Sequence, residues 1–229
     1  PITYRAESSI QTCSICHKEQ LTNAVCENSH FICDACHSYG TYAPVIAALR
    51  DSTEKDALLL LEKIMDLPSV HMHGPEHHAI VPCVLLTAFR NNGEHMNYDA
   101  ALSEICKRAK QVPGGTCGYW GVCGAAAGAG IFMSVMTGSS PLHKDAWPFP
   151  QKLVSIILSR LADVGGPRCC KRTSRIAIEE AVHFYSQFCS VNIPSSSITC
   201  KYCEDNRECI QEDCPYYPCL LYTSPSPRD

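Results

Sequence analysis

The chain has 229 residues, of which 45 % are hydrophobic, so it can bury a core and does not have the composition of a disordered protein. Its formal net charge of -4 argues against nonspecific nucleic-acid binding, which requires a basic surface. Its 17 cysteines include several Cys-x-x-Cys pairs, which suit metal binding better than a disulfide scaffold. We recognise no secretory signal and therefore expect a soluble cytoplasmic protein.

The sequence predicts a mainly α-helical fold with a small cysteine module at each end. We expect a zinc-knuckle module over residues 1–42, a helical cysteine/histidine domain over 43–190 and a C-terminal cysteine module over 191–219. The last ten residues, 220–229, resemble a translated sequencing adapter. We therefore expect this tail to be non-native and without a function.

The first module carries two Cys-x-x-Cys pairs separated by 16 residues: Cys13 and Cys16, then Cys33 and Cys36. Two tight turns at this spacing can face each other across a tetrahedral ion, and four thiolates are typical of structural zinc. We predict one zinc ion bound by these four thiols. Three further residues lie near these pairs: Cys26, His30 and His37. Each is either a surface or packing residue, or it replaces one of the four ligands or donates a hydrogen bond to one.

Apolar residues recur at helical spacing through the centre of the chain. We expect helices over residues 43–50, 53–65, 98–111, 121–137, 151–164 and 172–188, and another that starts at Gly74-Pro75-Glu76 and continues to residue 89. The helix over 98–111 is expected to be capped by Asn97.

The expected helix over 121–137 contains no charged side chain, and its Gly124 and Gly128 form a Gly-x-x-x-Gly pair. In a membrane such a pair favours helix dimerisation. Because the segment is short and rich in Gly and Ala, which gain little from lipid, we expect no membrane span. We read it as a buried helix packed closely against another helix.

Histidines and one glutamate crowd the turn that precedes the long apolar helix. His73, Glu76, His77 and His78 fall within six residues, and His71 lies just before them. The zincin order His-Glu-x-x-His is absent, although His73 and His77 can share a helix face. We predict that His73 binds metal and that Glu76 or His77 serves as proton donor or additional ligand. The alternative is that these side chains have capping and surface roles.

Two further cysteines lie in a glycine-rich segment, and a third and fourth are adjacent in sequence. The predicted catalytic thiols are Cys117, Cys123, Cys169 and Cys170. Three glycines are predicted to let the backbone approach an inorganic group: Gly115, Gly118 and Gly124. A cysteine at a helix N-terminus is expected to have a lowered pKa. We predict a shared site, against the alternative that each thiol is a small buried hydrophobe.

The C-terminal module places four thiols close together in sequence: Cys200, Cys203, Cys209 and Cys214. Zinc and an iron–sulfur cluster both suit such a set. A proline follows Cys214, as at the end of ferredoxin-type runs, but the other spacings differ from those of a ferredoxin. We predict a metal here and leave zinc and iron–sulfur both open.

Three motifs carry a family resemblance: the run His73 to His78, the run Cys117 to Ala125, and the pair Cys169-Cys170. Over residues 10–215 the sequence resembles an uncharacterised prokaryotic-type family, the DUF-type family catalogued as fifty-seven fourteen. Its members occur alone or joined to radical-SAM or methyltransferase domains, which implies a partner of that kind. A weaker similarity, carried by the run Cys123 to Gly128, is to proposed redox-active proteins named for a Cys-Gly-Cys-Ala-x-x-Gly pattern. That pattern has no matching neighbour at Cys83.

These features together favour a metal-binding redox or sulfur-handling protein that contains zinc and, through its central cysteines, an iron–sulfur or other thiolate-bound centre. One alternative is a non-catalytic zinc-binding adaptor in which every cysteine cluster is structural. Another is a zinc-dependent hydrolase that uses the histidine cluster, although the zincin spacing is missing. The sequence has no Rossmann fingerprint and no Walker loop, so we predict no nucleotide site.

Overall fold

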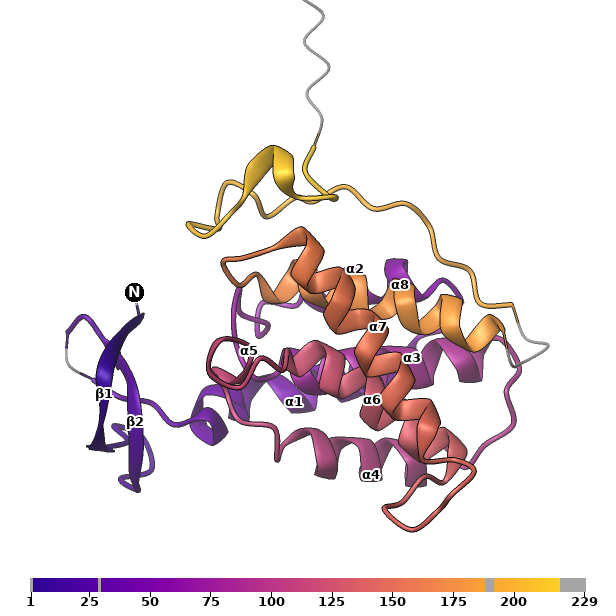
Figure 1. Ribbon diagram of the computed structural model, residues 1–229, viewed down its shortest axis with the longest axis horizontal. Helices are drawn as coiled ribbons and strands as arrows, with labels where there is room; N and C mark the ends of the chain where they lie inside the picture. Colours follow the sequence, from indigo (N-terminus) through magenta and orange to yellow (C-terminus); the bar gives the residue numbers. More distant parts are fainter. Residues whose placement is uncertain (1, 29, 188–191, 219–229) are drawn as a thin grey trace, which may run out of the picture.

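The computed structural model describes residues 2–28, 30–187 and 192–218. Within them it shows eight α-helices and a two-stranded β-hairpin that stands to one side of the helical bundle (Figure 1). The elements in chain order are β1 (Ile2–Thr12), β2 (Glu19–Cys26), α1 (Asp34–Asp51), α2 (Ala57–Met65), α3 (His77–Asn91), α4 (Tyr98–Ala109), α5 (Thr116–Tyr119), α6 (Gly124–Thr137), α7 (Pro148–Val164), α8 (Cys170–Ser186) and the 3-10 turn η1 (Gln211–Asp213). The predicted mainly helical fold is confirmed. The predicted tail over 220–229 lies outside the described residues.

The hairpin is an element that the sequence did not reveal. β1 and β2 pair antiparallel, with Ile10 opposite Leu21 and a register shift between Tyr4 and Ser9. Almost every residue of β1 is exposed, so the strand lacks the alternation of buried and exposed positions that would identify it in the sequence. In β2 only Val25 is buried, so the packing of the hairpin contributes little to its stability.

Helix α1 begins nine residues before the predicted start at residue 43. Gly40 and Pro44, which suggest a break, both lie inside the helix. Inside a helix a proline ring crowds the backbone carbonyl of the residue four positions earlier, which for Pro44 is Gly40. The domain boundary expected between residues 42 and 43 therefore falls within a continuous helix.

The other helix boundaries differ less from those predicted from the sequence. α2 starts at Ala57 rather than at residue 53, because the Asp56 side chain caps it by accepting from the N–H groups of Leu58 and Leu59 at 2.9 Å. Asn97 caps α4 as predicted, accepting from the N–H of Ala100. α7 begins three residues early, and α8 begins two residues early.

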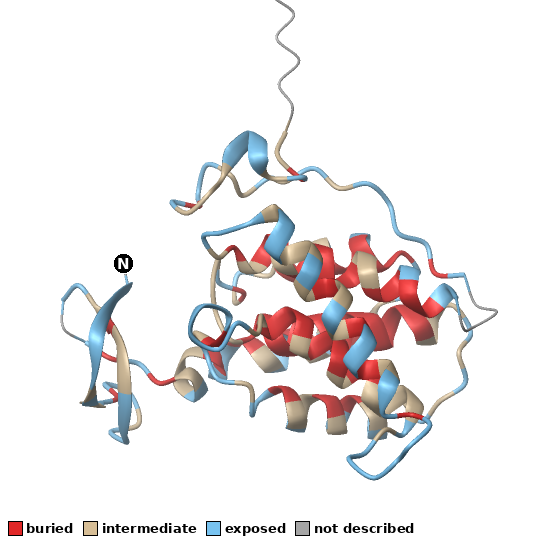
Figure 2. Cartoon of the chain, in the orientation of Figure 1, coloured by how far each residue is buried: buried red, intermediate tan, exposed pale blue. Residues whose placement is uncertain are grey.

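Helix α3 lies at the centre of the bundle. Its residues from His77 to Phe89 are all buried, and α2, α4, α6 and α8 surround it (Figure 2). At one end of this core, the ring of Phe89 meets the rings of Phe132 and Tyr185 edge-on, with centroids 4.8 and 4.2 Å away. A helix buried on every side has no polar face, which explains why its sequence reads as one apolar run.

Glycines let α6 approach α3 closely. A Cβ atom at Gly128 would lie 2.5 Å from the backbone oxygen of His78 and 2.9 Å from Cδ of Pro82, while one at Gly124 would collide with the His78 ring. The interpretation of α6 as a buried helix packed tightly against another is therefore confirmed. No helix in the described parts of the chain combines the length and the apolar character needed to cross a membrane.

Residues 192–218 run across the bundle with little regular structure (Figure 1). Asp56, besides capping α2, accepts from the backbone N–H and the hydroxyl of Ser196 at 2.8 and 2.7 Å. The Tyr202 hydroxyl donates to Asp66 at 2.6 Å, and the ammonium group of Lys201 pairs with the same carboxylate. These contacts hold the C-terminal segment against the two ends of α2.

Candidate functional site

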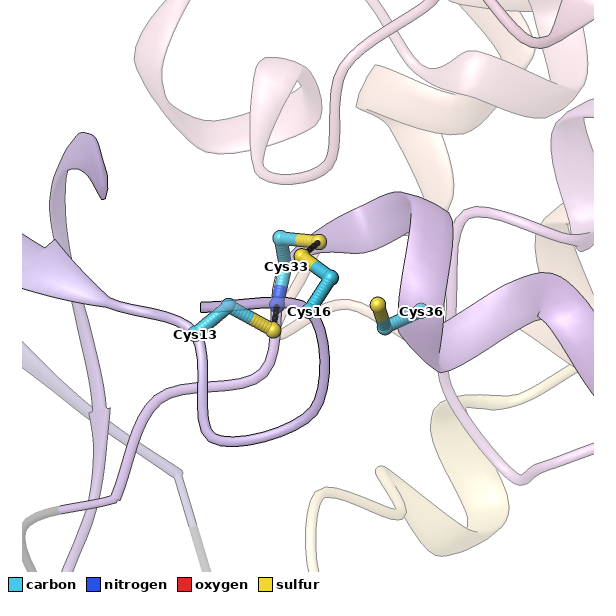
Figure 3. A group of neighbouring side chains, drawn as sticks. All are labelled: Cys13, Cys16, Cys33 and Cys36. Carbon is cyan, nitrogen blue, oxygen red and sulfur yellow. Dashed lines mark hydrogen bonds between the residues drawn. The ribbon is translucent and has the colours of Figure 1, made fainter. Parts of the chain in front are cut away.

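Four cysteines converge where the hairpin meets α1. Cys13 and Cys16 lie in the loop between β1 and β2, while Cys33 is the N-cap of α1 and Cys36 lies in its first turn (Figure 3). Their four sulfur atoms all lie within 4.8 Å of one another, and the sulfurs of Cys16 and Cys33 are 3.7 Å apart. Zn–S bonds of about 2.3 Å in a tetrahedron require sulfur separations of about 3.8 Å. The cluster therefore has the donors and spacing to hold a metal such as zinc.

The electrostatics of the cluster suit a bound cation. Backbone N–H groups of Cys16 and Cys33 lower the pKa of the Cys13 thiol to about 6. Burial and the adjacent thiols raise the pKa of Cys36 to about 12. Four neighbouring thiolates repel one another unless a cation compensates their charge, and zinc binding displaces their protons. A closed set of four protein ligands leaves no open position, which is typical of a structural rather than a catalytic ion.

Glu76 forms a second group with two histidines, His37 from α1 and His71 from the turn before α3. One ligand atom from each of the three residues lies within 4.8 Å of the others. Burial favours the protonated acid, yet the nearby imidazoles, chiefly that of His37, hold the pKa of Glu76 at about 2. The carboxylate in turn raises the pKa of His37. Sequence spacing gave no reason to join His37 to this turn, because α1 brings it there from 39 residues away.

The remaining histidines of the turn point elsewhere. Nε2 of His73 lies 3.1 Å from Oδ1 of Asn206 and 3.2 Å from a carboxylate oxygen of Glu208, both in the C-terminal segment. His77 is buried, which lowers its pKa to about 4, and its Nε2 donates to the carbonyl of His71 at 3.1 Å. Nδ1 of His78 donates to the carbonyl of Val112. The predicted metal ligand His73 and the predicted proton donor His77 therefore do not join Glu76 and its two histidine neighbours.

Electrostatic interactions link the predicted catalytic thiols in one chain. Cys117 in α5 interacts with Cys123, the N-cap of α6, and Cys123 does so with Cys170, the first residue of α8. Cys170 also interacts with Cys169, which interacts in turn with two thiols of the C-terminal segment, Cys200 and Cys214. In the described parts of the chain no three of these thiols bring their sulfurs within 4.8 Å of one another, so the predicted shared site stays a prediction.

Burial dominates the acidity of these thiols. It raises the pKa of Cys123, outweighing the hydrogen bonds from Thr173 and from the first turn of α6, so the expected lowering by the helix N-terminus does not occur. Burial likewise raises the pKa of Cys169, and it raises that of Cys170 to about 12 although the backbone of Gly74 acts in the opposite direction. As buried thiols these groups are protonated at neutral pH, and metal binding would have to displace their protons.

Two of the three predicted cofactor-binding glycines have structural roles in the fold. Gly115 has a φ of 81°, a left-handed conformation that favours glycine, and it starts α5. Gly124 makes room for the His78 ring, as described above. A Cβ at Gly118 would meet nothing within 4 Å, so the space beside Gly118 is open.

The C-terminal thiols Cys200, Cys203, Cys209 and Cys214 are all partly exposed. In the described parts of the chain, no set of three of them brings its sulfurs within 4.8 Å, unlike the N-terminal cluster. Cys200 accepts from the backbone N–H of Tyr202, and Cys209 accepts from that of Gln211, both at 3.4 Å. The metal predicted for this module stays a prediction.

The hairpin touches the end of the bundle that carries Cys117 and Cys170. The hydroxyl of Tyr4 in β1 accepts from the Arg168 guanidinium at 2.7 Å, and Asn23 in β2 donates to the hydroxyl of Tyr119 at 2.6 Å. The tyrosine rings of these two contacts lie 6.0 Å apart. Side-chain contacts therefore join the hairpin to the segments that carry Cys117 and Cys170.

Comparison with known proteins identifies one family. A family model described as a family of unknown function, DUF5714, matches residues 45–217. The match covers the bundle from within α1 onward, together with the C-terminal segment, and does not include the four-cysteine cluster. No curated protein and no solved structure matches the chain.

Proposed function

The chain belongs to the DUF5714 family of unknown function, and we propose that it is a metal-binding redox or sulfur-handling protein. In this proposal the N-terminal cluster holds a structural zinc ion, and the thiols around the start of α8 hold an iron–sulfur centre. The observation that carries the proposal is the four-cysteine cluster, whose sulfur atoms all lie within 4.8 Å of one another. Cys169 and Cys170 extend the proposal to the start of α8, because they interact electrostatically with each other and with Cys123, Cys200 and Cys214.

In the described parts of the chain no three of these thiols bring their sulfurs within 4.8 Å of one another, which favours a cluster over a single ion. Three ligands of one zinc ion must lie close together, as the N-terminal sulfurs do. An iron–sulfur cluster fills its centre with its own iron and sulfide atoms, so its cysteine ligands lie farther apart. Partly exposed thiols in a segment without regular structure can also adjust to such a group. When bound, the centre would transfer single electrons.

The protein's own residues would set the surroundings of that centre. Arg168 lies two residues before Cys170 and opposes the rise in its pKa, and Arg172 acts in the same way on Cys169. Positive charge next to thiolate ligands stabilises their ionised form. As partner we propose a radical-SAM or methyltransferase protein, the domains to which members of the resembled family are joined.

The test is anaerobic purification followed by zinc, iron and sulfide analysis and a visible absorption spectrum. We expect about one zinc per chain together with iron, acid-labile sulfide and a visible absorption band. Cys123→Ala should abolish the visible band while lowering the free energy of unfolding by only about 1 kcal/mol, because one small side chain is lost.

A matched control is Cys106→Ala. Cys106 in α4 faces Cys83 in α3, with the two sulfurs 3.7 Å apart, and neither is among the thiols proposed to hold the iron–sulfur centre. This variant should keep the visible band. A colourless protein with zinc as its only metal would refute the proposal and favour a non-catalytic zinc-binding adaptor.

A further inference from the structure

We propose that His37, His71 and Glu76 form a second metal site, which binds a divalent transition-metal ion and leaves coordination positions open to water. This site uses none of the cysteines and is independent of the proposed redox function. It differs from the N-terminal cluster in donor type, since two imidazoles and one carboxylate replace four thiolates. It also differs from the ligand set expected from sequence, which relied on His73.

His71 and Glu76 come from the turn before α3, His37 comes from α1, and the three side chains meet at the N-terminus of α3. Nδ1 of His71 lies 3.0 Å from Oε1 of Glu76, and Nδ1 of His37 lies 3.8 Å from Oε2. The two imidazole rings face each other with centroids 4.3 Å apart. The carboxylate therefore has one histidine beside each oxygen.

Two of the potential ligand atoms lack a hydrogen-bond partner within the described parts of the chain. Both Oε2 of Glu76 and Nδ1 of His37 are buried. A buried polar atom without a partner destabilises the folded state, and more so if it is charged. Their separation of 3.8 Å is too long for a hydrogen bond and slightly wider than the roughly 3.0–3.5 Å between two ligands whose bonds to one ion are about 2.1 Å long. An ion bound between them would satisfy both atoms.

The surrounding residues hold the group in place. A Cβ atom at Gly74 would collide with the Glu76 carboxylate, so glycine there leaves the space that this carboxylate occupies. His77 donates to the backbone carbonyl of His71 and fixes the turn. His37 directly follows Cys36, so a zinc ion on Cys36 would also fix the helical turn that carries His37. Glu76 and His71 are therefore restrained by the protein alone, and zinc on Cys36 would restrain His37 as well.

The site is accessible from one side. The Glu76 side chain is fully buried, whereas those of His37 and His71 are 27 % and 48 % exposed. An ion could therefore enter past His71 and keep water on its open side. Two histidines and one carboxylate with open positions are the ligand set of several catalytic zinc sites and of non-haem iron(II) sites. The carboxylate charge also favours a cation over an anion here.

The direct test is titration of the full-length, zinc-loaded protein with Co²⁺ under anaerobic conditions. Cobalt at this site should give weak d–d absorption without thiolate-to-cobalt charge transfer, and paramagnetically shifted imidazole signals in the NMR spectrum. His71→Ala should remove those signals and weaken Co²⁺ binding at this site more than about 100-fold, because loss of a direct ligand should exceed the 10–100-fold effect of outer-shell residues.

Two further variants complete the test. Glu76→Gln keeps the shape of the buried side chain but removes its charge, and it should also abolish the imidazole signals. His143→Ala is the control, because His143 is exposed and its ring bonds to the carbonyl of Gly138, so the imidazole signals of this variant should match those of the wild type. If His71→Ala binds Co²⁺ as the wild type does, or if no imidazole signal shifts on titration, the group is only an ion pair and the proposal is wrong. Because His71 is half exposed, this variant decides the question even if Glu76→Gln fails to fold.

Discussion

Cys33→Ser is expected to reduce bound zinc by about one ion per chain and to unfold the hairpin, while the helical bundle stays folded. Structural zinc contributes about 10–16 kcal/mol of apparent binding free energy in small modules. The hairpin has little else to stabilise it, because β1 is almost fully exposed and the small buried cluster beside it consists of Cys13, Phe31 and Cys33. Zinc analysis and the backbone NMR signals of residues 2–26 measure the two effects.

Cys26→Ser is the matched control for this experiment. Cys26 ends β2 and lies outside the group of four sulfurs. It should leave the zinc content and the hairpin signals unchanged. Unchanged zinc in Cys33→Ser would show that this thiol is not a ligand, whereas loss of zinc in both variants would mean that the two substitutions act through general unfolding.

Gly128→Ala is expected to destabilise the bundle by about 1–3 kcal/mol, the usual effect of forcing extra atoms into a packed core. The added methyl group would meet the backbone oxygen of His78 at 2.5 Å, and backbone of α3 cannot move aside without disturbing the core around it. For a chain of this size the melting temperature should fall by several degrees. Thermal and denaturant unfolding followed by circular dichroism measure the change.

Gly40→Ala provides a comparison with the opposite sign. Gly40 lies within α1, and a Cβ atom there would meet nothing within 4 Å. Alanine should therefore stabilise this helix by about 0.5–1 kcal/mol through its higher helix propensity. Equal effects of the two substitutions would indicate that close packing of α6 on α3 is not what Gly128 provides.

Sequence reasoning succeeded where the relevant signal is local. Two Cys-x-x-Cys pairs carry their own spacing, so the converging set of four thiols could be expected without knowledge of the fold. Asn97 correctly indicated the start of α4, because a capping side chain bonds to residues only a few positions away. The small residues of α6 likewise indicated a helix that another helix approaches closely.

Features that depend on distant parts of the chain were missed. His37 reaches Glu76 only because α1 continues through Pro44, which reads as a break in the sequence. The hairpin was missed because its strands bury almost nothing, and the interaction of Cys169 with Cys200 and Cys214 depends on how residues 192–218 cross the bundle. None of these arrangements leaves a periodic or short-range pattern.

Because α1 is continuous, the orientation of the hairpin relative to the bundle depends on the number of residues in this helix. The helix carries Cys33 and Cys36 at its start and buries Val45 and Leu49 in the bundle, with the Thr41 hydroxyl bonded to the carbonyl of Ser69 between them. Each added residue turns an α-helix by about 100° and lengthens it by about 1.5 Å. One residue inserted between Cys36 and Thr41 would therefore swing the hairpin about a quarter turn around the helix axis, whereas seven would restore its direction some 10 Å farther out. The direction and distance of the hairpin from the bundle are thus set by the length of one helix. A flexible linker in its place would fix neither.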